Sequence, residues 1–203
     1  MKIAVVGAAG MVGSRVLTEA AGRGHDLLAI VRGRRPGVAD VPVVVADSGR
    51  MATLFAGTDA VVAATRPAPG EEYTVTGTTT ALLDAAAEAG TRILVVGGAA
   101  PLRVPGGGLV LDDPRYVPPE YRAIAGASAA QLDVCRTHPA DWVYLSPPAV
   151  LEPGARTGSY RRGTTTLITR PDGTSRISAE DLAAAVVDEL ETIGTDRHFT
   201  VGY

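Results

Sequence analysis

The sequence predicts an α/β protein in which helices cover both faces of a doubly wound, parallel β-sheet. Short apolar segments alternate with helix-compatible segments along the chain. The apolar segments are rich in valine and isoleucine, as expected for strands buried on both faces. The chain has 203 residues, of which 46% are hydrophobic and 20% are charged. This length and composition predict a single domain, residues 1–203, with a substantial core.

The expected elements follow in a regular order. The strands are residues 3–6, 27–31, 41–46, 60–64, 93–96, 142–145 and 198–201. The helices are residues 11–22, 51–56, 74–89, 123–137 and 179–193. Each strand is a short apolar run, and the third is rich in valine. The first helix follows a cluster of glycines, and the last begins at a capping-box pattern, Ser178 to Asp181.

Two long stretches interrupt this alternation. Residues 101–119 contain five prolines and the run Gly106-Gly107-Gly108, and residues 147–173 contain several glycines and three consecutive threonines. Both follow the carboxyl ends of strands, where open α/β sheets bind ligands. We expect residues 101–122 and 147–173 to form the two walls of a substrate pocket, because loops of this length are usually lids or binding loops.

A glycine-rich turn follows the first strand. Gly7, Gly10 and Gly13 occur at three-residue spacing, and a helix-compatible segment comes next. Gly7 permits the turn, Gly10 lets the backbone approach a phosphate, and Gly13 lets the helix pack closely on the strand. Ala9 stands where the commoner motif has its second glycine. The arrangement predicts a dinucleotide site in a Rossmann-type fold, with the pyrophosphate at the helix N-terminus.

The end of the second strand indicates which dinucleotide is bound. An acidic residue there would hold the ribose 2′-hydroxyl of NAD(H). Here Val31 is followed by Arg32, with Arg34 and Arg35 close behind, and Asp26 lies at the opposite end of the strand. Guanidinium groups suit a 2′-phosphate by charge and by their fork of donors. We therefore predict NADP(H); a solvated basic turn is the alternative.

Further cofactor contacts are expected where other strands end. Asp47 and Ser48 are placed to reach the adenine, or alternatively to cap the next helix. Residues 64–66 would lie along the pyrophosphate and nicotinamide ribose, and residues 97–98 near the nicotinamide. The predicted cofactor-binding residues are Gly7, Ala9, Gly10, Met11, Val12, Arg32, Arg35, Asp47, Ser48, Ala64, Thr65, Arg66, Gly97 and Gly98.

The usual catalytic residues of short-chain dehydrogenases are missing. Those enzymes use a Tyr-x-x-x-Lys pair, in which the lysine lowers the tyrosine pKa. The single lysine here is Lys2, which has no tyrosine four residues before it, and the three histidines show no metal-ligand spacing. Hydride transfer by positioning remains, with a proton from water or a modest donor. Flavins, quinones and extended conjugated systems need little acid catalysis, and so are the expected acceptors.

Several polar residues of the two long stretches and their flanks are expected to face the pocket. They are Tyr116, Tyr121, Ser146, Tyr160, Arg161 and Arg162. We select Tyr160, Ser146 and Tyr121 as catalytic candidates, with Tyr160 first as proton donor because its loop is expected to cover the nicotinamide. The alternative is that Tyr160 packs its loop onto the core. Arg161 and Arg162 would hold a carboxylate or phenolate substrate, or else provide exposed solubilising charge.

The chain resembles the atypical short-chain dehydrogenase/reductases of the NAD(P)H-binding type, which include NmrA-like proteins, NADH-flavin reductases and biliverdin IXβ reductase/flavin reductase. The resemblance rests on the glycine motif, Val31-Arg32, Thr65-Arg66, Val117-Pro118-Pro119, Pro147-Pro148, residues 153–160 and residues 176–182. It implies that Arg32 and Arg35 bind the 2′-phosphate, Thr65 and Arg66 the middle of the cofactor, and that Pro147 lies beside the nicotinamide. Two family positions differ: residues 98–100 lack the usual serine, and Ala149 replaces a histidine.

These observations favour an NADPH-dependent reductase of a flat, conjugated small molecule. Two alternatives stay open: a redox-neutral cyclase, dehydratase or epimerase that retains bound NADP, and a non-enzymatic NADP(H)-sensing protein. The net charge of −3, without a basic stripe, argues against a nucleic-acid partner, and no apolar run approaches membrane-spanning length. The single cysteine, Cys135, fits a reducing compartment, so we expect a cytoplasmic protein. The sequence does not indicate the oligomeric state.

Overall fold

The computed structural model describes residues 1–33, 42–45 and 48–203. An eight-stranded sheet runs through the molecule in the order β3-β2-β1-β4-β5-β6-β10-β8. Its strands are β1 (Lys2–Val6), β2 (Asp26–Val31), β3 (Val43–Val45), β4 (Ala60–Ala63), β5 (Arg92–Val96), β6 (Trp142–Ser146), β8 (Arg161–Gly163) and β10 (His198–Gly202). All neighbours are parallel except β8, which runs antiparallel to β10. Successive strands are added toward one edge of the sheet from β1 to β3 and toward the other edge from β4 onward. Open α/β sheets bind ligands at the point where this order reverses, here between β1 and β4.

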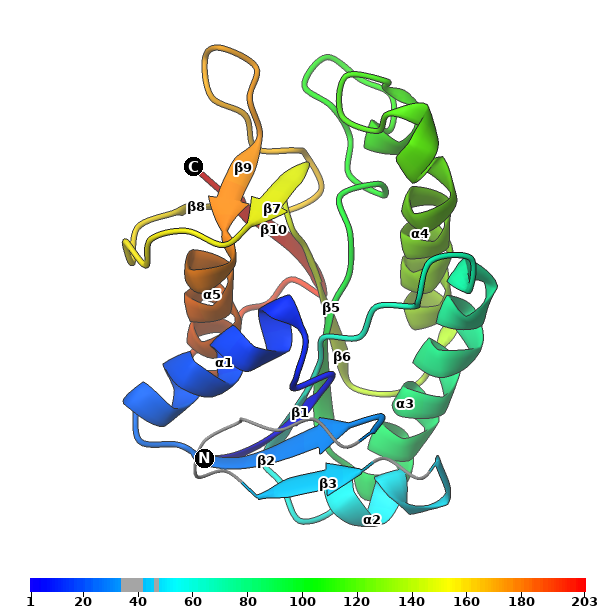
Figure 1. The fold of residues 1–203 in the computed structure, drawn as a ribbon, viewed down its shortest axis with the longest axis vertical. Helices are drawn as coiled ribbons and strands as arrows, with labels where there is room; N and C mark the ends of the chain where they lie inside the picture. The colour runs from blue at the N-terminus through cyan, green and yellow to red at the C-terminus, as the bar shows by residue number, and fades with distance from the viewer. Residues whose placement is uncertain (34–41, 46–47) are drawn as a thin grey trace.

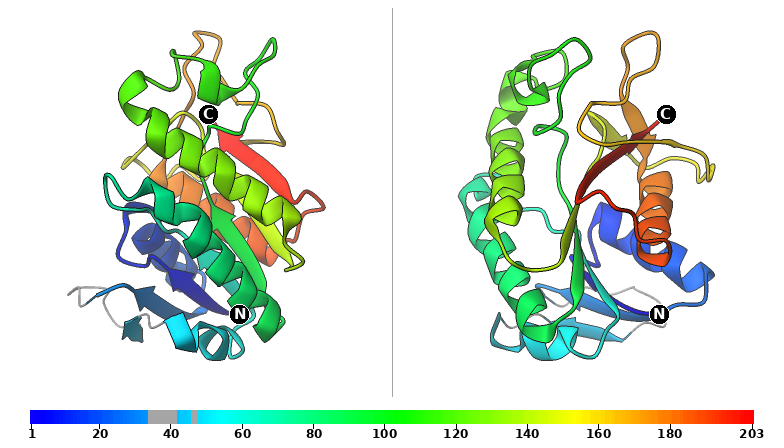
Figure 2. Two further views of the ribbon diagram at one scale, coloured as in Figure 1. Left: turned by 90° about the vertical axis from the view of Figure 1, so that its right-hand side faces the viewer. Right: turned by 180° about the vertical axis from the view of Figure 1, so that it is seen from behind.

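Helices cover both faces of the sheet (Figures 1 and 2). Helices α1 (Met11–Gly22) and α5 (Ala179–Glu191) pack together on one face. The opposite face carries α2 (Met51–Phe55), α3 (Val75–Ala89) and α4 (Arg122–Thr137). Short 3₁₀ turns occur at η1 (Ser48–Arg50), η2 (Glu72–Thr74), η3 (Val110–Asp112) and η4 (Pro119–Tyr121). No described helix is both long and apolar enough to cross a lipid bilayer.

The strand sequences supply two cores because successive side chains point to opposite faces. In β1, Ile3 and Val5 belong to the core beneath α1 and α5, whereas Ala4 and Val6 belong to the core on the α3 face. Strand β5 divides its side chains in the same way. This double burial explains why the strands read as continuous apolar runs, and it confirms the predicted Rossmann-type fold class.

The structure differs from the expected elements mainly in the second long stretch. That stretch contains β7 (Val150–Glu152) and β8, and β7 pairs in parallel with β9 (Arg176–Ser178) in a separate two-stranded sheet. These strands have three residues each, so no alternation within them marks a strand. The third strand is shorter than expected: residue 42 lies outside it, and residues 41 and 46 lie outside the described part of the chain.

Of the two reciprocal hydrogen bonds of a capping box, one is formed at the start of α5. The Ser178 Oγ accepts a hydrogen bond from the backbone N–H of Asp181 at 3.0 Å. The Asp181 carboxylate does not return to the Ser178 backbone; it accepts from the backbone N–H groups of Thr157 and Gly158. The cap therefore also attaches the segment that follows β7 to helix α5.

Candidate functional site

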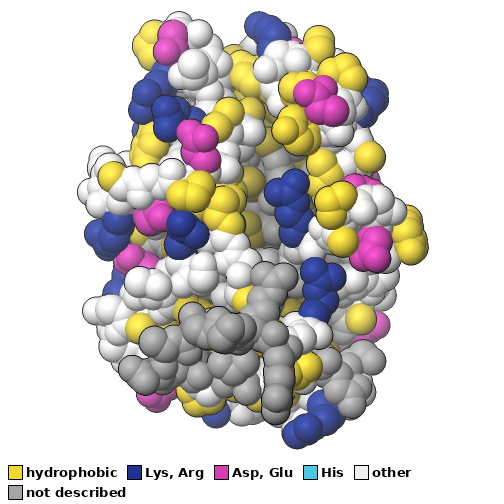
Figure 3. All heavy atoms as spheres, in the orientation of Figure 1, with side chains coloured by type: hydrophobic (Ala, Val, Ile, Leu, Met, Phe, Trp, Pro, Cys, Tyr) yellow, Lys and Arg dark blue, Asp and Glu magenta, His cyan; other side chains and the backbone are white. Residues whose placement is uncertain are grey.

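A cleft of about 1140 Å³ opens at the carboxyl ends of the central strands. Figure 3 shows the hollow, with dark blue Lys and Arg side chains in its lower part and yellow hydrophobic side chains around its upper part. Its lining includes Gly7, Ala9, Gly10, Met11, Val12, Arg32, Ala64, Thr65, Arg66, Gly97, Gly98 and Pro147. All of these were predicted to bind the cofactor. Of the other predicted positions, Arg35 and Asp47 lie outside the described residues, as does the side chain of Ser48.

The glycine turn has the geometry that its spacing predicts. Gly7 adopts a φ of +81°, and a Cβ there would collide with the carbonyl oxygen of Ala64. A Cβ at Gly13 would collide with the carbonyl oxygen of Gly7, so this glycine lets α1 start directly against the turn. Gly10 has extended backbone and precedes the helix. The turn thus brings the chain close to the strand ends, where a side chain at residue 7 or 13 has no room.

The N-terminus of α1 faces this surface. Gly10 provides no side-chain cap, and no acidic residue lies in the first turn of the helix. The first N–H groups of a helix have no partner within it, and together with the helix dipole they favour an anion. Gly10, Met11 and Val12 all line the cleft. This end of the cleft is therefore built for a phosphate.

Two arginines lie at the same end of the cleft. The Nη2 of Arg32, at the end of β2, donates a hydrogen bond to the carbonyl oxygen of Arg66 at 3.0 Å. Both side chains line the cleft, and they are the only Lys, Arg, Asp or Glu residues among its described lining. The carbonyl bond orients the Arg32 guanidinium without neutralising it, so the charge stays available to an anionic ligand.

The floor of the cleft contains a buried tyrosine that sequence reasoning missed. Tyr144, on β6, lies beneath Gly97 and Gly98: a Cβ at Gly97 would collide with the phenol, and one at Gly98 would lie 2.7 Å from the Ser128 Oγ. The Tyr144 Oη accepts from the Gly98 N–H at 3.4 Å and lies 2.9 Å from the Ser128 carbonyl oxygen. Burial raises the pKa of Tyr144, so it stays protonated. The Gly97-Gly98 pair is the sequence signal that could have indicated a side chain packed beneath it.

The tyrosine belongs to a short polar network. Its Oη also lies 3.2 Å from the Oε1 of Gln131, whose Nε2 donates to the Thr79 Oγ1 at 3.1 Å. The Thr79 hydroxyl donates in turn to the carbonyl oxygen of Val75. The network connects β6, α4 and α3 under the cleft and positions the floor.

The upper part of the cleft is largely apolar and is lined by residues of both long stretches and of the start of α4; that it takes the substrate stays a prediction. Tyr116, Val117, Tyr121 and Ile124 line one wall, and Pro148, Ala149, Val150 and Leu151 line the other. The two stretches also contact each other, because the Tyr116 hydroxyl donates to the carbonyl oxygen of Gly173 at 3.2 Å. A small cluster of Leu102, Val104, Val110 and Leu167 packs them together.

Tyr160 does not face the cleft, which corrects the expectation that its loop covers the strand ends. Its hydroxyl donates to the Asp188 carboxylate on α5, and its ring packs against the core beneath α1 and α5. Burial, together with the bond to Asp188, raises the pKa of Tyr160. Arg156 forms two hydrogen bonds with Glu19 on α1, at 2.6 and 2.7 Å. These interactions hold the segment on the helices, away from the cleft.

The other polar candidates divide between the cleft and the rest of the molecule. Tyr121 lines the cleft and is 55% exposed. Ser146 is fully buried, with its Oγ 2.9 Å from the Nε2 of His198. Arg161 donates to the main-chain oxygens of Thr169 and Tyr203. Arg162 forms an ion pair with Glu189 at 2.8 Å, so neither arginine reaches the cleft.

The fold and the cleft together define a dinucleotide-binding protein of the Rossmann type. The chain belongs to the NAD(P)H-binding family, whose model matches residues 7–192. The uncharacterised protein YwnB of Bacillus subtilis (strain 168) is 39% identical over 198 residues, which are 94% of this chain and 92% of YwnB. The family assignment confirms the resemblance inferred from the motifs.

Two crystal structures are also similar over the full chain. One is a protein of Bacteroides thetaiotaomicron, provisionally named an epimerase, with 34% identity and a TM-score of 0.89 over 100% of this chain and 96% of that one. The other is a protein of Streptococcus pneumoniae, provisionally named an NADH-flavin reductase, with 31% identity and a TM-score of 0.87 over 100% of this chain and 99% of that one. The family and the relative provisionally named an NADH-flavin reductase support an NAD(P)H oxidoreductase.

Proposed function

We propose that this protein is an NADPH-dependent reductase of a flat, conjugated small molecule of the flavin, quinone or aromatic natural-product type. The observation that carries the proposal is the division of one cleft into two chemically different ends. The lower end has glycines, a helix N-terminus and two arginines, whereas the upper end has apolar walls. The relative provisionally named an NADH-flavin reductase supports the same reaction class.

The lower end fits a nicotinamide dinucleotide. A side chain at Gly7 or Gly13 would collide with the backbone, so the tight turn requires glycine there, and the free N–H groups of α1 suit a pyrophosphate. We assign the 2′-phosphate to Arg32, and Arg35 stays a prediction for the same role. Thr65 and Arg66 would contact the middle of the cofactor, and Pro147 would lie beside the nicotinamide. A bound NADPH would supply the hydride.

The upper end suits an acceptor that needs little acid catalysis. Among the described residues that line the cleft there is no lysine, histidine, cysteine, aspartate or glutamate. The apolar walls would orient a planar ring system and exclude water, so that positioning supplies most of the catalysis. Of the three catalytic candidates, Tyr121 is the one that lines the cleft, and we propose that it or water supplies the proton.

A redox-neutral reaction is the second candidate, because one relative is provisionally named an epimerase. For proton transfer in either reaction, the described cleft offers phenols, one serine and one threonine. A cytoplasmic location and the lack of a nucleic-acid partner stay predictions from composition.

The decisive experiment follows NADPH absorbance against a panel of flavins, quinones and aromatic polyketides, with NADH in parallel. We expect turnover with at least one acceptor class and a preference for NADPH. Arg32→Gln should weaken NADPH binding by roughly tenfold or more, the effect of one charge-assisted hydrogen bond, and leave NADH binding unchanged. Arg136→Gln, an exposed arginine that is paired with Asp133 on α4, is the matched control.

Two results would contradict the proposal. Equal affinity of the wild-type protein for NADPH and NADH would contradict the proposal that Arg32 binds the 2′-phosphate. Tight NADPH binding without oxidation by any acceptor would favour the cofactor-sensing alternative, and turnover without net oxidation of the cofactor would favour the redox-neutral one.

A further inference from the structure

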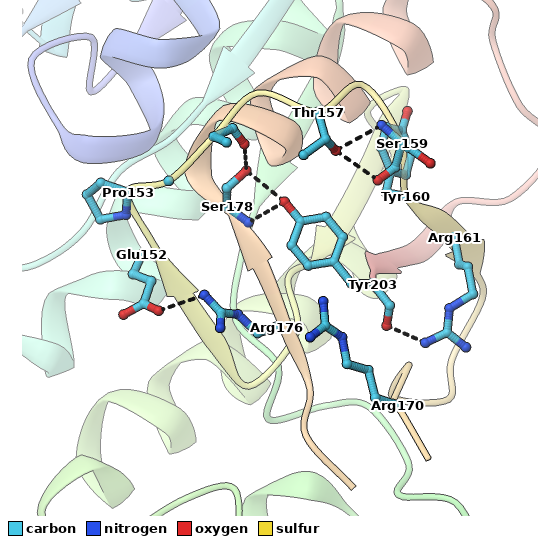
Figure 4. A pocket seen from close by; sticks show the side chains of 12 residues that line it. Glu152, Pro153, Thr157, Ser159, Tyr160, Arg161, Arg170, Arg176, Ser178 and Tyr203 are labelled. Atoms are coloured by element: carbon cyan, nitrogen blue, oxygen red, sulfur yellow. Dashed lines mark hydrogen bonds and ion pairs between the residues drawn. The ribbon is translucent and has the colours of Figure 1, made fainter. Parts of the chain in front are cut away.

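A second pocket, of about 590 Å³, lies beside β7 and β9 (Figure 4). Strand β7 borders both cavities: Val150 and Leu151 line the cleft, whereas Glu152 lines the second pocket. The lining of the second pocket comprises Glu152, Pro153, Gly154, Ala155, Thr157, Ser159, Tyr160, Arg161, Arg170, Arg176, Ser178 and Tyr203. The function proposed above uses none of these residues.

Three arginines converge on this pocket from three segments. Figure 4 shows Arg161 from β8, Arg170 from the loop before β9, and Arg176 from β9 around the ring of Tyr203. The single acidic side chain in the lining, Glu152, lies 3.2 Å from Arg176. Both partners of this pair are about half exposed, at 55% and 48%, so the interaction is weak. The lining thus carries three guanidinium groups and one carboxylate, an excess of positive charge that favours an anion.

Arg170 is the pocket arginine with neither an ion pair nor a side-chain hydrogen bond among the described residues, although its charge acts on the exposed Asp172 carboxylate two residues away. Its guanidinium carbon lies 5.5 Å from the centre of the Tyr203 ring. No ion pair joins it to any carboxylate in the part of the chain that the structure describes. Arg161, in contrast, already donates to main-chain oxygens of Thr169 and Tyr203. These bonds orient Arg161 at the pocket wall.

The base of the pocket is held rigidly. The Tyr203 Oη donates to the Asp181 carboxylate at 2.6 Å and lies 2.9 Å from the Ser178 Oγ. Asp181 is fully buried; burial alone would raise its pKa, but the hydrogen bonds from Thr157, Tyr203 and Gly158 lower it. The ring against which Arg170 lies is therefore fixed before any ligand arrives, which reduces the entropy lost on binding.

We propose that this pocket binds the phosphate group of a small anion. Three guanidinium groups line this one pocket, a set of donors that suits the several oxygens of a tetrahedral phosphate better than a planar carboxylate, which one fork can satisfy. The Ser159 hydroxyl, also in the lining, offers a further donor. Free phosphate and an organic phosphate monoester share this chemistry.

The test is isothermal titration calorimetry at constant ionic strength, with inorganic phosphate and phenyl phosphate as separate probes. The protein is saturated with NADPH so that the glycine turn is not available to the probes. We expect one phosphate per chain. Arg170→Gln should lower the affinity about tenfold, the loss expected for one charge-assisted hydrogen bond, while Arg170→Lys retains part of it. Tighter binding of phenyl phosphate would indicate an organic ligand.

Arg197→Gln is the matched control, because Arg197 also lies over an aromatic ring, that of Trp142 at 5.3 Å, but lies outside the pocket. This variant should bind phosphate like the wild type. Arg176→Gln is a second pocket variant, should Arg170→Gln not fold. The proposal is overturned if the NADPH-saturated wild type binds no phosphate, or if the folded pocket variants bind it as tightly as Arg197→Gln does.

Discussion

Tyr144 determines the shape of the cleft floor at the scale of single residues. Its phenol is fully buried in the position that a side chain at residue 97 would need, and the Ser128 side chain occupies the position that one at residue 98 would need. Two glycines therefore follow β5, and the backbone N–H of Gly98 donates to the phenol. The glycine at residue 97, beside the expected nicotinamide position, is thus required by a side chain of the neighbouring strand, β6.

Removal of the Tyr144 hydroxyl should destabilise the protein. In Tyr144→Phe, the Gln131 amide oxygen and the Gly98 N–H lose a buried partner, which costs about 1–3 kcal/mol of the free energy of unfolding. Urea denaturation measures this change. Tyr73→Phe, at a tyrosine that is 80% exposed, is the control and should unfold at the wild-type urea concentration. Coincident unfolding curves for both variants would mean that the buried hydroxyl contributes nothing.

At the scale of elements, the segment between β7 and β8 is attached to two helices through carboxylates on α1 and α5. Glu19 on α1 binds Arg156, and Asp181 on α5 binds the backbone of Thr157 and Gly158. Arg23 joins the same group by its ion pair with Glu19 at 2.7 Å. These contacts explain why Tyr160 points to Asp188 on α5 and not into the cleft.

The ion pair between Glu19 and Arg156 should make the free energy of unfolding depend on pH in the acid range. The hydrogen bond from Arg156 lowers the pKa of Glu19 from its ordinary 4.5 to about 2. The unfolded chain therefore takes up the proton first as the pH falls. The stabilisation is complete above the unfolded pKa and is lost progressively between about pH 5 and pH 2.

Glu19→Gln should remove this part of the pH dependence. The free energy of unfolding, measured by denaturant titration at a series of pH values, should fall less steeply in the variant than in the wild type over that acid range. Glu88→Gln, at an exposed glutamate on α3, should keep the wild-type slope. An unchanged slope in Glu19→Gln would show that the ion pair with Arg156 is not maintained in solution.

At the scale of the whole molecule, the cleft joins parts of the chain that are far apart in sequence. Its lining runs from Val6 to Leu151 and includes the ends of β1, β2, β4 and β5. A ligand that contacts these strand ends together binds only the folded chain, so it stabilises the fold as a whole.

NADPH should therefore raise the melting temperature. At about 100 times its dissociation constant a ligand adds roughly 2.7 kcal/mol to the free energy of unfolding. Differential scanning fluorimetry with NADPH and NADH measures the shift. In Arg32→Gln the shift with NADPH should shrink while the shift with NADH persists. A melting temperature that does not respond to either dinucleotide would contradict the assignment of the cleft.

Much of the fold and of the cofactor end could be predicted because the responsible signals are local. Burial on both faces makes each strand a continuous apolar run, and the turn at residues 7–13 needs glycine for reasons confined to a few residues and one neighbouring strand. Parallel strands place their carboxyl ends at one edge of the sheet. Residues after β1, β2, β4 and β5 therefore had to lie together.

The sequence by itself thus determined the Rossmann-type sheet, the glycine turn and the position of Arg32 at the edge of a nucleotide site. Only the tertiary structure decided where Tyr160 points, what lies beneath Gly97 and Gly98, and that three arginines share a second pocket. The reason is physical: these arrangements depend on pairs distant in the chain, such as Arg156 and Glu19, which are 137 residues apart. No local periodicity or spacing encodes such a contact.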